Sequence, residues 1–191
     1  MRARLHISAV IALLLACGGI TQADELPAGH QSLLVLRVLA YDRNLKTRAK
    51  DTVTIVVAYK AGSSASEEAR GGIVKALEEL ASKATVGGLP VRVMAVPSSD
   101  PASFESKLVA AHASALYVCP SLADSISAIS AITRRRSIVT LAGTETYVKA
   151  GLSIGLAMRN SKATVVVNLT AAHAEGADLD AALLHVSEII R

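Results

Sequence analysis

The chain has 191 residues, which is enough for one domain of ordinary size with a proper core. Hydrophobic residues make up 51% of it and aromatic residues only 3%, so we expect a core of Val, Ile, Leu and Ala. This scarcity of aromatic side chains argues against stacking on nucleic-acid bases, and we expect no nucleic-acid partner. The net charge of +4 is too small to indicate an acidic partner.

The N-terminal residues have the features of an export signal. The positively charged start, MRAR, precedes an apolar run at residues 5–15, and small residues at positions 21 and 23 form a cleavage pattern. The run is too short to span a bilayer, which needs about 20 apolar residues. We therefore predict a signal peptide at residues 1–23 and a single exported, periplasmic domain at residues 24–191, with no membrane span in the mature chain.

A lipoprotein signal is the alternative interpretation of the same residues. The sequence Leu14-Leu15-Ala16-Cys17 resembles a bacterial lipobox, which would limit the signal to residues 1–16 and leave the mature chain anchored through acylated Cys17. An ordinary signal peptide is favoured, because Leu is not the usual residue before Ala-Cys. Cleavage after Ala23 would leave Cys119 as the only cysteine, and its apolar neighbours indicate a buried thiol rather than a nucleophile.

The first predicted element is a helix at residues 31–41. Apolar residues surround most of its circumference, which indicates either a buried helix or one whose outer face is covered by a partner. Arg37 alone interrupts the apolar character. We expect its side chain to extend to solvent or to pair with Asp42.

Four strands that all read as buried follow, at residues 51–59, 90–96, 114–119 and 137–141. Helices separate them, and each helix has a start signal. These are a capping box from Ser64 to Glu67, Asp100 followed by Pro101, and Ser121 with Asp124. Arg134-Arg135-Arg136 ends the third of these helices and complements its macrodipole. Alternating strands and helices of this kind give a parallel sheet with right-handed crossovers.

The chain after residue 150 breaks this alternation. Strands at residues 152–159 and 162–167 are joined only by Asn160-Ser161, and a two-residue connection requires an antiparallel hairpin. The predicted fold class is therefore α/β: three layers, with a mixed, mostly parallel sheet, helices on both faces and a C-terminal antiparallel hairpin. A final helix is expected to start at Asp178, with Leu179, Leu183, Val186 and Ile190 facing inward.

The motifs of common enzymes and of metal or nucleotide sites are missing from the sequence. It contains no G-x-S-x-G elbow, Walker A motif, G-x-G-x-x-G loop or Cys/His cluster, so we expect no enzyme, cofactor or metal. Hydroxyl side chains at Ser63, Ser98 and Ser121 precede helices at the carboxyl edge of the sheet. Helix capping accounts for them; an anion or other small molecule bound there is the alternative function.

Residues 137–191 carry an ordered set of motifs. A hydrophobic strand precedes a short helix, a Gly, a strand with a basic tip, a strand ending in Asn, small residues, a second Gly and a Leu-Leu helix. The residues are Val139-Thr140-Leu141, Tyr147, Gly151, Ile154, Arg159, Val167-Asn168-Leu169, Ala171-Ala172, Gly176, Leu179 and Leu183-Leu184. This order resembles the YfiR/HmsC-like family (DUF4154) of small bacterial periplasmic proteins.

The resemblance implies a non-enzymatic regulator. The best-known members bind the periplasmic domain of an inner-membrane diguanylate cyclase and restrain cyclic-di-GMP synthesis, and others are linked to sensor kinases. For this chain it implies an inner-membrane signalling protein as the partner, with a homodimer as a further expectation.

The expected partner surface is the apolar helix at residues 31–41, through Leu36, Arg37, Ala40 and Tyr41. Among the family motif residues, Gly151, Asn168 and Gly176 are expected to be structural. Gly151 would supply a positive φ after the short helix, and the Asn168 side chain would bond to backbone where the last strand ends.

Overall fold

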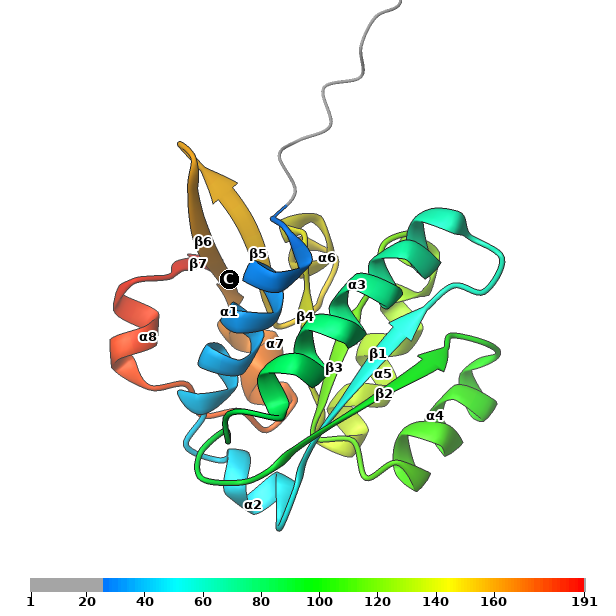
Figure 1. Cartoon of the computed structure of the whole chain (residues 1–191), viewed down its shortest axis with the longest axis horizontal. Helices are drawn as coiled ribbons and strands as arrows, with labels where there is room; N and C mark the ends of the chain where they lie inside the picture. Colours follow the sequence, from blue (N-terminus) through cyan, green and yellow to red (C-terminus); the bar gives the residue numbers. More distant parts are fainter. Residues whose placement is uncertain (1–25, 191) are drawn as a thin grey trace, which may run out of the picture.

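A computed structural model describes residues 26–190, so the predicted signal peptide and Cys17 lie outside the described residues. Figure 1 shows a central sheet with helices packed against it. The elements in chain order are α1 (Ala28–Ala40), α2 (Leu45–Ala49), β1 (Val53–Tyr59), α3 (Ser64–Ala81), β2 (Val91–Pro97), α4 (Pro101–Ala110), β3 (Ala115–Val118), η1 (Ala123–Ser125), α5 (Ile126–Arg136), β4 (Val139–Ala142), α6 (Glu145–Lys149), β5 (Ile154–Arg159), β6 (Lys162–Asn168), α7 (Leu169–Ala174), α8 (Ala181–His185) and β7 (Glu188–Ile190).

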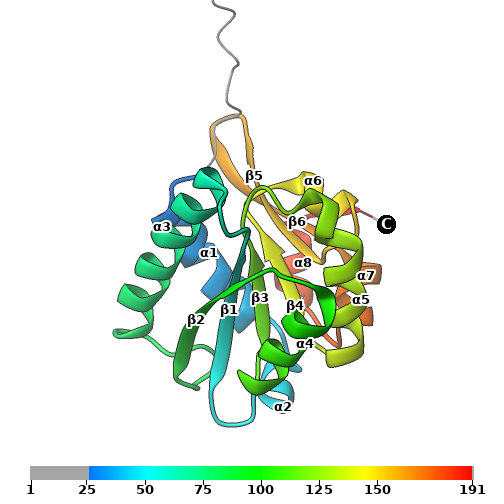
Figure 2. The same ribbon diagram turned by 90° about the vertical axis from the view of Figure 1, so that its right-hand side faces the viewer.

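The described strands form one mixed sheet in the order β2-β1-β3-β4-β5-β6-β7. β2, β1, β3, β4 and β5 are parallel, whereas β6 runs antiparallel to β5. The helices α1 and α3 cover one face and α4 and α5 the other, as Figure 2 shows from the side. The predicted fold class is confirmed. The core is aliphatic on both faces, with Phe104 and Tyr117 as its largest fully buried side chains.

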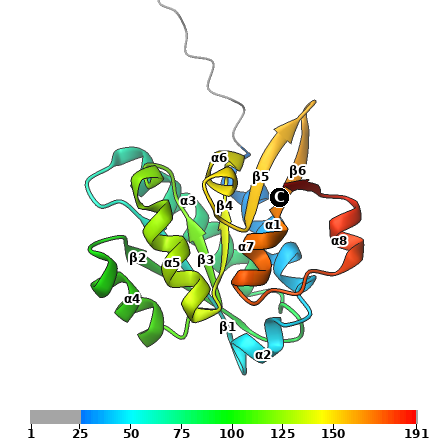
Figure 3. The same ribbon diagram turned by 180° about the vertical axis from the view of Figure 1, so that it is seen from behind.

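The hairpin β5–β6 has the connection that the sequence predicted. Arg159 pairs with Lys162, and the two residues between them, Asn160 and Ser161, have φ angles of 48° and 61°. Positive φ at both central residues is the geometry of a type I′ turn, whose twist matches that of antiparallel strands. Figure 3 shows the hairpin extending beyond the neighbouring helices.

The predicted final helix is wrong at both ends: its N-cap lies two residues after the predicted cap, Asp178, and it is shorter than predicted. The helix begins after Asp180, whose Oδ1 accepts a bond from Ala182 N at 2.8 Å, and ends at His185. Val186 is 72% exposed, and the following residues form β7, which pairs parallel to β6. Without β7, the outer edge of β6 would be open. Backbone pairing with this edge therefore outweighs the helical spacing of the apolar residues.

Two further predictions need correction. β2 was expected to be buried, but it lies at an edge of the sheet, and its residues Arg92 and Met94 are exposed. The Ser64–Glu67 capping box does not form as predicted, because α3 starts one residue earlier than the box requires. The N-cap residue is Ser63, and its side chain forms no capping bond. Glu67 Oε1 accepts a bond from Gly62 N at 2.9 Å instead.

We predict that Gly155→Ala destabilises the fold by about 1–3 kcal/mol, because α6 packs directly on this glycine of β5. A Cβ there would lie 2.5 Å from Val148 Cγ2 and 3.0 Å from the Thr144 carbonyl oxygen. Urea denaturation measures the change. Gly71→Ala is the matched control: nothing lies within 4 Å of its added Cβ on α3, so we expect a gain of about 0.5–1 kcal/mol. Equal effects at both positions would contradict the packing argument.

Candidate functional site

The four residues expected to contact a partner lie near the end of α1 but differ in exposure. Leu36 is 7% exposed and belongs to the core, because this side of α1 packs on the sheet and α3. Arg37, Ala40 and Tyr41 are exposed, and Tyr41 has an exposed fraction of 45%. We call these three residues the α1 surface. Leu36 supports this surface from the inside.

Of the two alternatives for Arg37, the side chain extends to solvent and does not pair with Asp42. Asp42 turns inward where α1 ends, and its side chain is paired with Arg48 of α2. Its Oδ1 also accepts bonds from the backbone of Asn44 and Asp178, each at 3.0 Å. Arg37 forms no hydrogen bond or ion pair with any described residue, so its guanidinium is open to solvent on the α1 surface.

Tyr41 lies at a junction between the two ends of the domain. Its carbonyl oxygen accepts a bond from Asp180 N at 2.8 Å, directly before α8. The next residue but one, Arg43, forms ion pairs with Asp178 at 3.6 Å and Asp180 at 3.3 Å. The C-terminal segment therefore holds the end of α1 in place, which gives the α1 surface a fixed backbone.

The three family motif residues occupy turns and a helix start. Gly151 follows α6 with a φ of +119°, and its carbonyl oxygen accepts from Ser130 Oγ at 3.2 Å. Asn168 is the N-cap of α7 and its Oδ1 accepts from Ala171 N at 3.0 Å. Gly176 has a φ of +79°, and a Cβ there would lie 3.3 Å from that of Ser137.

Two of the three hydroxyl groups noted at the carboxyl edge of the sheet, those of Ser63 and Ser121, bond to each other. Ser63 Oγ and Ser121 Oγ lie 2.9 Å apart and link the loops after β1 and β3. Asp100 Oδ1 accepts from Ser103 N at 2.9 Å as the cap of α4. The carboxylates of Glu67 and Asp100 would also repel an anion. These contacts favour a structural role for Ser63, Ser121 and Asp100 over an anion site at this edge.

A hollow of about 610 Å³ lies at this edge, between the ends of β3 and β4 and the second half of β5. Its wall includes Leu26, Gly143 and Met158, and the ion pair between Glu145 and Arg159 crosses its polar side. Beneath it, the Tyr117 hydroxyl is bonded to Gln31 Oε1, and Gln31 Nε2 donates to the Leu26 carbonyl at 2.6 Å. These bonds fix the start of α1 against the sheet.

Glu175 is a fully buried carboxylate that the sequence analysis did not identify. It accepts hydrogen bonds from Thr133 Oγ1 at 2.7 Å, from Thr140 N at 2.8 Å and Oγ1 at 3.0 Å, and from Ser153 Oγ. It thus joins the end of α7 to α5, β4 and the start of β5. The available signal was its isolation: it is the only acidic residue between positions 146 and 177.

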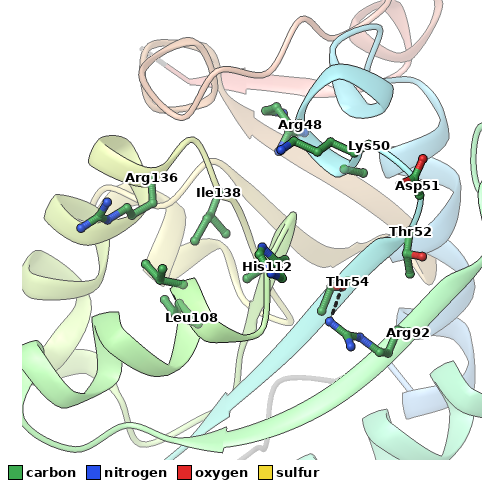
Figure 4. A pocket seen from close by; sticks show the side chains of 13 residues that line it. Arg48, Lys50, Asp51, Thr52, Thr54, Arg92, Leu108, His112, Arg136 and Ile138 are labelled. Atoms are coloured by element: carbon green, nitrogen blue, oxygen red, sulfur yellow. Dashed lines mark hydrogen bonds between the residues drawn. The ribbon is translucent and has the colours of Figure 1, made fainter.

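A cation-rich hollow of about 540 Å³ opens at the amino-terminal edge of the sheet (Figure 4). Its walls come from the start of β1, the start of β4, the first half of β2 and the end of α4. Its lining residues are Arg48, Ala49, Lys50, Asp51, Thr52, Thr54, Arg92, Leu108, Val109, His112, Ala113, Arg136 and Ile138. We call it the basic cleft. The sequence analysis missed it because these residues are scattered over 91 positions of the chain.

Metal ligands do not gather in the part of the chain that the structure describes: no group there of three or more His, Cys, Asp or Glu side chains could hold an ion. Cys119 is fully buried within the core around β3. Residues 26–190 also contain no helix with the length and apolar character needed to cross a membrane.

Comparison with protein families gives one match: the model of the YfiR/HmsC-like family, DUF4154, covers residues 35–188. The chain belongs to the YfiR/HmsC-like family. The resemblance inferred from the C-terminal motifs is therefore confirmed, and it extends from the second half of α1 to the start of β7. A search among curated protein sequences found no match.

Solved structures resemble this family member in fold. An ABC domain from Streptococcus pneumoniae in complex with L-Trp and a conserved domain protein from Vibrio cholerae each have 15% identity and a TM-score of 0.61 over 86% of this chain. A ligand-free, open substrate-binding protein from Clostridium difficile has 21% identity and a TM-score of 0.51 over 78% of the chain. The matches cover 62%, 60% and 57% of those chains, so this chain spans less than two thirds of their length.

We predict that the carboxyl group of Glu175 makes the wild type lose stability, relative to Glu175→Gln, as pH rises. Burial raises the pKa of Glu175 above its ordinary 4.5, and its hydrogen bonds oppose this rise without cancelling it. At pH values between the pKa of Glu175 in the unfolded chain and its higher pKa in the folded protein, the folded protein binds more protons. Raising the pH through this range therefore favours unfolding. Below pH 4.5 the wild type and the Gln variant should differ little, because both side chains are neutral there.

The measurement is urea denaturation of both proteins at pH values from 4 to 8. Glu68→Gln, an exposed residue of α3, is the control and should give a pH profile parallel to that of the wild type. A Glu175→Gln profile that also runs parallel to the wild type would show that this carboxyl group does not titrate differently in the folded state.

Proposed function

We propose that this protein is a non-enzymatic, exported regulator that binds the periplasmic part of an inner-membrane signalling protein, a diguanylate cyclase or a sensor kinase, and restrains it. The observation that carries the proposal is the family match over residues 35–188. The signal peptide expected at residues 1–23 supports export to the periplasm. The partner and the direction of its control are part of the proposal.

The α1 surface supports a role in protein contact. Tyr41 is one of four large hydrophobic side chains that are more than a third exposed among the described residues. Arg37 stands one turn before it with a guanidinium that has no protein partner in the described part of the chain. Exposed Tyr and Arg side chains are the residue types that contribute most to interface energies. The hydrogen bonds of Asp42 and Asp180 already fix the backbone at the end of α1, so binding a partner would require less ordering of this segment.

We predict that Tyr41→Glu lowers recovery of the signalling receptor by about tenfold when the protein is used to capture partners from solubilised membranes. A carboxylate at the centre of an interface loses the apolar contact and must be desolvated. The thermal midpoint should stay close to that of the wild type, because Tyr41 is exposed. Cellular cyclic-di-GMP, or phosphorylation of the kinase substrate, gives the functional readout.

Met94→Glu is the matched control, since Met94 is 37% exposed on the far edge of the sheet. This variant should recover the receptor as the wild type does. Equal recovery by the Tyr41→Glu variant and the wild type would place the contact elsewhere. A wild-type protein that captures no signalling receptor would contradict the proposed function itself. A second copy of the chain on the α1 surface would appear as a dimer that Tyr41→Glu dissociates.

A further inference from the structure

The basic cleft has the size and walls of a ligand site. Its volume of about 540 Å³ lies within the range of pockets that hold small molecules. In Figure 4, Leu108 and Ile138 stand on one side, and Thr52, Thr54 and Arg92 on the other. Leu108 and Ile138 are themselves buried, so the exposed apolar surface on their side is Val109, and the opposite side carries hydroxyl and cationic groups. A molecule that fits both walls has an apolar body and a polar, anionic end.

Some of the cleft's cations are committed to protein groups. Arg48 is paired with buried Asp42 and donates to the Ser114 carbonyl at 2.7 Å. Arg136 is paired with Glu105 at 2.8 Å, outside the cleft. Asp42 compensates the charge of Arg48, whereas Arg136 shares the single carboxylate of Glu105 with Arg135.

Lys50 and Arg92 remain without a carboxylate partner among the described residues. Arg92 Nη2 donates to the Ala111 carbonyl at 2.6 Å and to Thr54 Oγ1 at 3.3 Å, which orients the guanidinium over the start of β1. Its other two nitrogens form no bond with the described residues. Asp51 is the single carboxylate among the lining residues, so the cleft keeps an excess of positive charge.

The ends of α4 and α5 explain only part of this charge. Both helices finish at this edge, where their last carbonyls attract cations. The bond from Arg92 to the Ala111 carbonyl is one such interaction at the end of α4. Lys50 and the other two nitrogens of Arg92 form no such bond with the carbonyls at these helix ends. The apolar wall is also unusual in its exposure, since Val109 is 45% exposed beside these cations.

We propose that the basic cleft binds a small organic anion, whose carboxylate or phosphate group contacts Arg92 and Lys50 and whose apolar body lies against Val109. Charge-assisted hydrogen bonds from a guanidinium to such a group are the strong kind, and they give direction as well as affinity. The site lies at the edge of the sheet opposite to the helix N-termini, and its lining includes no residue of the α1 surface.

Lys50 offers a variant that removes charge without weakening the fold. Its backbone has a φ of 57° and a ψ of −99°, a conformation that a glycine adopts without strain and a lysine does not. Lys50→Gly therefore deletes one cation and relieves the backbone at the same position. Its thermal midpoint should equal or exceed that of the wild type, so that any loss of binding reflects the lost charge.

The experiment is isothermal titration calorimetry with phenyl phosphate and with benzoate, which separate a phosphate from a carboxylate preference. Wild type should bind at least one of them saturably, more tightly than inorganic phosphate, and benzyl alcohol should not bind. Arg92→Gln should weaken binding about tenfold and Lys50→Gly about threefold. Lys75→Ala, an exposed lysine of α3, should bind as the wild type does.

The proposal is overturned if neither anion binds, or if the Arg92→Gln, Lys50→Gly and Lys75→Ala variants all bind as the wild type does. Equal affinity for phenyl phosphate and inorganic phosphate would overturn the role of the apolar wall. Tyr41→Glu should leave anion binding unchanged, and Arg92→Gln should leave receptor capture unchanged. Failure of one proposal is therefore distinguishable from failure of the other.

Discussion

The buried ion pair between Asp42 and Arg48 joins four segments of the chain at the amino-terminal edge of the sheet. The two side chains are 1% and 8% exposed. Asp42 also binds the backbone before α8, and Arg48 binds the carbonyls of Ser114 and Ser137 before β3 and β4. Removing one partner of such a pair leaves a buried charge, which typically costs about 3–5 kcal/mol. Both proposed sites flank this pair, with Tyr41 before it and Lys50 after it, so their backbones are placed by the same interaction.

Glu175 has the corresponding role inside the second half of the sheet. Four donor groups, one each from Thr133 and Ser153 and two from Thr140, partly replace the water that a carboxylate loses on burial. They connect α7 with α5, β4 and the start of β5. α7 then leads to α8 and β7, which cover the outer edge of β6. Glu175 and the bonds to Asp42 and Arg43 are therefore polar anchors of the C-terminal segment. The pairing of β7 with β6 and the burial of Leu179 and Leu183 also hold this segment in place.

The likeness to ABC-type and substrate-binding proteins is a likeness of fold. A parallel sheet covered by helices on both faces recurs with many functions, and the site decides which of them a given protein has. In this chain the polar groups at the carboxyl edge bond to one another, and the basic cleft lies at the opposite edge. The family match assigns this protein to the YfiR/HmsC-like proteins, and neither proposed surface depends on the ligands of the fold relatives.

The sequence by itself determined the α/β class, the hairpin and the family, because these depend on local signals. The spacing of β-branched residues and the Asn160-Ser161 turn act over a few residues, and the order of the C-terminal motifs can be read directly along residues 137–191. Only the tertiary structure decided which strands lie at the edges of the sheet. Arg92 is exposed because β2 is an edge strand, and Ile189 and Ile190 belong to a strand because they pair with β6. The same holds for Asp42, Glu175 and the basic cleft. Their partners lie far apart in the chain, and a single residue's environment follows from which distant segments the sheet brings together.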